Sequence, residues 1–191
     1  MKTLLLIVLL FQYETEKHYE KLDTDKNFGS IITEITITVS TSYKPEEQID
    51  NFVKRVKKDK TTFCFNEDFC SKNFLRSTGK LLPGKSYNIK IFQITGMVTT
   101  EQCVNFLRNQ KAVMLGAQGL TLAYDVAGDE FPKGKYVTSF DEKDVLWKDP
   151  KGYCRVPVVF SSYTDDFGFF LGYFGANLDN KSCILGFFEN K

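Results

Sequence analysis

The sequence Gly-Ala-Gln-Gly at positions 116–119 is the first candidate for a ligand-binding motif in this chain. It follows a short apolar run, residues 112–115, and precedes apolar residues that predict a helix. A glycine turn at a helix N-terminus presents free backbone N–H groups to an anion, and the helix dipole favours negative charge there. The turn therefore makes Gly116, Gln118 and Gly119 candidate ligand-binding residues, with a phosphorylated small molecule as the ligand.

The same turn has a purely structural interpretation. It is neither the GxGxxG fingerprint of dinucleotide-binding proteins nor the GxxxxGK[ST] of P-loops, and no acidic residue is well placed for a ribose. A tight connection from strand to helix with a positive φ angle also requires glycine. This second interpretation is the one the pattern favours.

Carboxylates gather shortly after this turn, in Asp141-Glu142-Lys143-Asp144. Two or three carboxylates at a strand end could hold Mg²⁺ or act as general acid and base. The same residues suit a helix start, with Asp141 as the cap and Glu142 and Asp144 in the first turn. Capping is the favoured interpretation, while Asp141 and Glu142 remain candidate ligand-binding residues. No metal site and no cofactor are predicted.

Nucleophilic catalysis finds little support in the sequence. The single histidine, His18, lies in a charged N-terminal segment, so a triad would have to recruit it from outside the predicted domain. Five cysteines are present but no CxxC pair, which argues against zinc. Cys103 has apolar neighbours and is expected to be a buried thiol. No catalytic residue is predicted.

Composition and charge narrow the classes of function. The chain is 42% hydrophobic and 15% aromatic, with 25 Lys and Arg against 24 Asp and Glu. The balanced charge argues against a general nucleic-acid binder, which needs excess positive charge. The basic run at residues 54–60 is expected to be a solvated helix end.

The first residues, MKTLLLIVLLF, have the lysine and apolar run of a signal peptide but no small-x-small cleavage site. The run is too short to span a bilayer, which takes about 20 apolar residues in a helix. We expect residues 1–27 to comprise an apolar segment with the features of a signal peptide, followed by a charged linker. We expect residues 28–191 to form one globular domain. This start slightly favours secretion or the cell envelope over the cytoplasm.

Apolar periodicity predicts the elements of that domain. Residues 31–39 alternate as a strand does, and a helix capped by Ser42 carries its apolar stripe at every third or fourth position. A second helix, residues 101–109, begins after Thr99 or Thr100, and residues 112–115 suggest a buried strand. Four later runs, at 136–140, 154–160, 167–174 and 183–188, are rich in aromatic and β-branched residues and separated by turns. The expected fold class is α+β: a mixed sheet, two to three helices in the first two-thirds, and an antiparallel, aromatic-rich C-terminal meander.

The function favoured by these features is a non-enzymatic domain that binds a protein or a small molecule. The aromatic run at residues 167–174 is more often a core strand than a contact surface, although it holds more aromatics than one strand face can bury. The alternative is a small enzyme that binds a phosphorylated ligand at Gly116–Gly119, with Asp141 and Glu142 as metal or acid–base groups.

Overall fold

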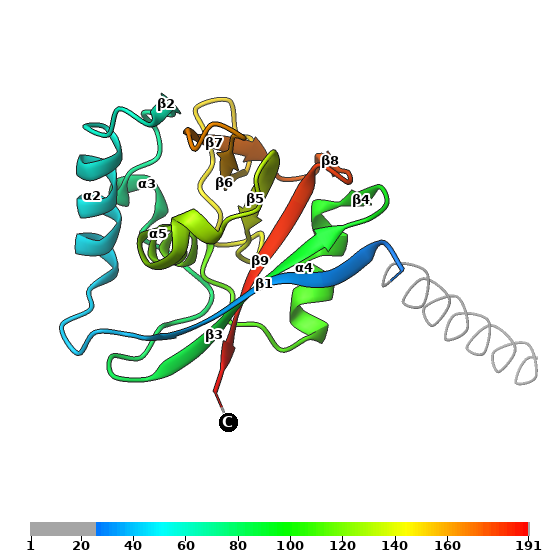
Figure 1. Cartoon of the computed structure of the whole chain (residues 1–191), viewed down its shortest axis with the longest axis horizontal. Helices are drawn as coiled ribbons and strands as arrows, with labels where there is room; N and C mark the ends of the chain where they lie inside the picture. The colour runs from blue at the N-terminus through cyan, green and yellow to red at the C-terminus, as the bar shows by residue number, and fades with distance from the viewer. Residues whose placement is uncertain (1–25, 191) are drawn as a thin grey trace, which may run out of the picture.

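The computed structural model describes residues 26–190, so the predicted signal peptide lies outside the described residues. One mixed sheet dominates the domain, with strand order β1-β3-β9-β5-β6-β7-β2 (Figure 1). Its strands are β1 (Phe28–Thr38), β2 (Thr62–Phe65), β3 (Ser86–Ile94), β5 (Lys135–Ser139), β6 (Arg155–Ser161), β7 (Phe167–Tyr173) and β9 (Ser182–Glu189). The short strands β4 (Val98–Thr99) and β8 (Asn177–Leu178) pair separately. The helices are α2 (Pro45–Val56), α3 (Ser71–Phe74), α4 (Thr100–Asn109) and α5 (Gly116–Ala127), followed by the 3-10 turn η1 (Gly128–Glu130). The predicted α+β class with a mixed sheet is confirmed.

The capping predictions had different outcomes for the two helices. At α4, Thr99 forms a capping box: its hydroxyl accepts a hydrogen bond from the Gln102 backbone N–H, and the Gln102 side chain accepts from the Thr99 N–H. At α2 the predicted cap Ser42 is wrong, because the cap position is Lys44 and Pro45 begins the helix. Proline fits there since the first helical N–H needs no partner.

The sheet is covered on both faces. Helices α2 and α5 pack on one face, where Ile49 and Phe52 of α2 are fully buried, and α4 packs on the other (Figure 1). Strand β9 therefore sends Leu185 and Phe187 into one core and Ile184 into the other. Burial on both faces explains why residues 183–188 read as a continuous apolar run.

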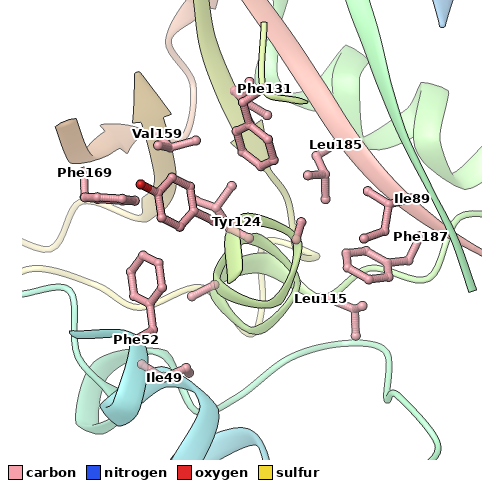
Figure 2. Close-up of a cluster of buried hydrophobic side chains, with 14 of the residues drawn as sticks. Ile49, Phe52, Ile89, Leu115, Tyr124, Phe131, Val159, Phe169, Leu185 and Phe187 are labelled. Carbon is pink, nitrogen blue, oxygen red and sulfur yellow. The ribbon is translucent and has the colours of Figure 1, made fainter. Parts of the chain in front are cut away.

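Aromatic rings form the centre of the larger core (Figure 2). The Tyr124 ring of α5 meets four phenylalanine rings edge to face, with centroids 5.0 to 5.9 Å apart. These partners are Phe52, Phe131, Phe167 and Phe169. Edge-to-face rings gain about 0.5–1.5 kcal/mol per pair beyond their burial, so α2, α5 and β7 are joined through one cluster.

The predicted meander comprises β5, β6 and β7, which pair antiparallel in chain order. Strand β9 does not continue it: β9 pairs antiparallel with β3 and parallel with β5, in the middle of the sheet. The strand predicted at residues 112–115 is wrong, because only Val113 makes a bridge, to Phe187. Within residues 26–190, none of the helices combines the length and hydrophobicity that crossing a bilayer requires.

Candidate ligand-binding site

The predicted glycine turn begins α5. Gly116 has φ +45°, and its N–H donates to the Phe140 carbonyl, 3.1 Å away. Gly119 lies one turn further along, inside the helix. A Cβ atom there would lie 2.8 Å from Leu115 Cβ and 2.9 Å from Phe187 Cε2. Gly116 thus serves the turn itself, whereas Gly119 allows α5 to pack closely against β9.

The carboxylate of Asp141 lies against Gly116. A Cβ atom on Gly116 would be 2.0 Å from Asp141 Oδ2, so only glycine leaves room for this side chain. Asp141 is 4% exposed, and its Oδ1 accepts a hydrogen bond of 2.8 Å from the Thr78 N–H. The Thr78 hydroxyl in turn accepts from the Glu142 N–H at 3.0 Å. Asp141 therefore joins three segments: the start of α5, the loop at Thr78 and the end of β5.

The helix predicted to start at Asp141 is wrong, since residues 143–145 form a turn. Glu142 therefore does not lie in the first turn of a helix, as the sequence suggested. It makes a bidentate ion pair with Arg108 of α4, at 3.0 Å (Nε to Oε1) and 2.6 Å (Nη2 to Oε2). In the part of the chain that the structure describes, no group of three or more His, Cys, Asp or Glu is arranged to hold a metal ion.

Burial raises the pKa of Asp141 to about 7. The hydrogen bonds from Thr78 oppose this rise, while the nearby charges of Glu142 and Asp144 add to it. An anion at the start of α5 would meet this carboxylate in its ionised form above neutral pH. For an anion to bind at the glycine turn, the Asp141 carboxylate must therefore be protonated or must move away from Gly116.

Asp141→Asn is expected to make the stability less dependent on pH. The folded-state pKa of about 7 lies above the ordinary 3.8, so the folded protein holds the proton more tightly than the unfolded chain. This stabilisation is complete below about pH 4 and is lost as the pH rises through 7, roughly 2–3 kcal/mol between about pH 5 and pH 8. Urea unfolding across that range should show a flatter curve for Asp141→Asn. The exposed Asp68→Asn, which is not among the charges that shift the pKa of Asp141, is the control, and equal slopes for both variants would contradict the assignment.

Gln118 lies on the other side of the α5 start and lines a cavity of about 510 Å³. Its Nε2 donates to the Leu75 carbonyl at 2.6 Å, which holds the side chain in place. The wall of the cavity comes from four places in the chain: the start of α2, residues 75–83, α5 and the turn after Asp141. The lining residues are Tyr43, Pro45, Leu75, Arg76, Ser77, Lys80, Leu81, Pro83, Gln118 and Val145.

The structure thus brings Gly116, Asp141 and Glu142 together and places Gln118 beside them in the cavity wall. The cavity itself was not predicted from the sequence. Of its lining residues the sequence singled out only Gln118, in the glycine turn, as a candidate for binding. Hydrogen bonds between residues far apart in the chain, such as those of Asp141 with Thr78 and of Gln118 with Leu75, bring these segments together.

Tyr43 contributes its ring to the cavity wall, while its hydroxyl is buried and has no hydrogen-bond partner within the described residues. Burial raises the pKa of Tyr43 to about 12, so the hydroxyl stays neutral. Tyr43→Phe is expected to leave stability unchanged or raise it by about 1 kcal/mol, because an unsatisfied buried hydroxyl costs free energy. Chemical unfolding of both proteins would measure this. A loss of more than about 1 kcal/mol would show that the hydroxyl has a partner in solution.

The other chemical candidates are positioned as follows. Cys103 is buried, and burial raises its pKa to about 12, so it is an unreactive thiol. In the aromatic run of β7, Phe167 and Phe169 point into the core. Phe170 lies on the opposite face, with its ring 6.2 Å from that of the half-exposed Phe63. Side chains of this run therefore pack on both faces of the sheet.

Comparison of the chain with protein-family models, with curated proteins and with solved structures found no match.

Proposed function

We propose that this chain is a non-enzymatic binding domain that holds a small molecule in the cavity beside α5. The cavity carries the proposal. Small-molecule sites are typically clefts of about 300–1,000 Å³ with mostly apolar walls and a few placed polar groups. This cavity has a volume of about 510 Å³, with walls of leucine, proline, valine and tyrosine and with polar groups at Arg76, Ser77, Lys80 and Gln118.

The lining supports retention of a ligand rather than reaction. Two of its polar side chains are already fixed by hydrogen bonds to backbone carbonyls: Ser77 Oγ to Gly79 at 2.8 Å and Gln118 Nε2 to Leu75 at 2.6 Å. Fixed side chains give a preformed wall, which lowers the entropy cost of binding. The groups that most often transfer protons, carboxylate and imidazole, do not occur among the lining residues.

An enzyme is the second candidate, and one observation favours it. The pKa of Asp141, about 7, is suited to general acid–base work near neutral pH. Asp141 does not line the cavity, but it binds Thr78, the neighbour of the lining residue Ser77. If Asp141 is the acid or base, Asp141→Asn should keep ligand binding and abolish turnover of the bound compound. In a binding domain, the compound leaves the wild-type protein unchanged.

Filling the cavity tests the proposed function. A fragment library is screened by ligand-observed NMR, and the hits are tested again on Val145→Trp, in which a large ring occupies part of the cavity. Val126→Trp is the matched control, because Val126 is 51% exposed on α5 and does not line the cavity. We expect hits to lose about tenfold or more in affinity on Val145→Trp only, since a blocked pocket forfeits its apolar contacts. Equal binding to both variants, with circular dichroism showing intact folds, would contradict the proposal.

A further inference from the structure

We propose that the ligand of this cavity is a soluble amphipathic anion: a carboxylate or phosphate ester that carries a compact apolar group. The inference rests on the proposed function and specifies its ligand class. In this arrangement Arg76 and Lys80 bind the anionic head group. Leu75, Leu81 and Val145 contact the apolar part.

Positive charge without a partner is the first reason. Arg76 and Lys80 both line the cavity, and neither has an ion pair among residues 26–190. Some cations of the domain are paired, such as Arg108 with Glu142 and Arg155 with Asp149. Arg76 and Lys80 are both exposed, and two unpaired cations at the mouth of one cavity favour an anion there.

Two carboxylates near this wall are already bound by other residues. Glu142 is held by Arg108 in a bidentate pair. Asp141 accepts the Thr78 N–H and lies against Gly116. The same bond to Thr78 anchors the middle of the segment that carries Arg76 and Lys80. The charge of this wall thus remains available to a ligand, and its backbone is fixed before the ligand arrives.

The apolar part of the lining is the second reason. Leu81 is 6% exposed, whereas Leu75 is 43% exposed, so the apolar wall runs from the interior to the surface. Prolines at positions 45 and 83 add rigid apolar surface. An inorganic anion would leave this wall in contact with water, whereas an apolar group bound there would remove area from water at about 25 cal/mol per Å². The site therefore suits a molecule with both properties.

Three naphthalene compounds separate these contributions: 1-naphthoate, 1-naphthyl phosphate and the uncharged 1-naphthalenemethanol. Binding to the full chain is measured by NMR titration and calorimetry. We expect both anions to bind more tightly than the alcohol.

Arg76→Gln and Lys80→Gln should each lower the affinity for the anions about fivefold, and the double variant about twentyfold, as expected for exposed charge-assisted contacts. Raising the salt concentration should reduce the difference between anion and alcohol. Lys54→Gln, an exposed cation outside the lining, should change nothing.

The outcomes separate the two proposals. If the alcohol binds as tightly as the anions and all three are lost on Val145→Trp, the cavity is a binding site but the anionic ligand class is wrong. If none of the three compounds binds, and the fragment hits bind Val145→Trp as tightly as the wild type, the proposed function itself fails. In a third outcome, the protein co-sediments with phosphatidylserine vesicles, this binding is lost when Arg76 and Lys80 are replaced, and the soluble anions do not bind. The two cations would then bind a membrane surface, and the inference would be overturned.

Discussion

Gly116→Ala is expected to lower the free energy of unfolding by about 3 kcal/mol. A side chain in the left-handed region costs about 1–2 kcal/mol, and forcing an atom into a filled site costs about 1–3 kcal/mol. Both apply here, since Gly116 has φ +45° and its Cβ would lie 2.0 Å from Asp141 Oδ2. Urea unfolding monitored by fluorescence of Trp147 and by circular dichroism would measure the loss.

A matched glycine separates the two costs. Gly152 also has a positive φ, +85°, but no atom lies within 4 Å of its Cβ position. Gly152→Ala should therefore lose only the conformational part, about 1 kcal/mol. In an Asp141→Ala background, Gly116→Ala should cost less than it does in the wild type. Equal costs in both backgrounds would show that the carboxylate does not occupy the space above Gly116.

Phe52→Ala is expected to lower the free energy of unfolding by about 3–5 kcal/mol, the range found when a buried phenylalanine is truncated. Phe52 is fully buried, and its ring lies 5.0 Å from Phe169 and 5.7 Å from Tyr124 (Figure 2). Its removal leaves a cavity between α2, α5 and β7. This is a large fraction of the roughly 5–15 kcal/mol that stabilises an ordinary domain.

The control for Phe52 is another phenylalanine of the sheet. Phe63 in β2 is 55% exposed, and its ring meets Phe160 and Phe170 at more than 6 Å. Phe63→Ala should cost about 1 kcal/mol or less, because little of its surface is removed from water on folding. Similar losses for the two variants would contradict the placement of Phe52 at the centre of the core. Thermal unfolding under identical conditions is sufficient to rank them.

Local patterns in the sequence predicted local structure well. The alternation at residues 31–39 marks β1, and the stripe of Ile49, Phe52 and Val56 marks the buried face of α2. These predictions succeed because burial on one face imposes its period on the residues directly. The turn at Gly116 also follows from a local need, a positive φ angle that glycine alone adopts at low cost.

Predictions that depended on tertiary partners did less well. Asp141 to Asp144 have the composition of a helix start, but the Asp141 carboxylate accepts from Thr78, 63 residues away, and no helix forms. Residues 112–115 are apolar because they pack against the two cores, not because they form a strand. The cavity depends on four separate segments, and no local pattern encodes their meeting.

Because β9 lies between β3 and β5, the sheet remains in two halves until residues 182–189 have left the ribosome. The pairing of Ile89 with Phe187 connects distant parts of the chain, and sheets rich in such pairings fold slowly. Until then β3 and β5 each present an open edge to other nascent chains, which is a known route to aggregation. The strand that completes the sheet is thus synthesised last among the described elements, and we expect both open edges to persist until it is available.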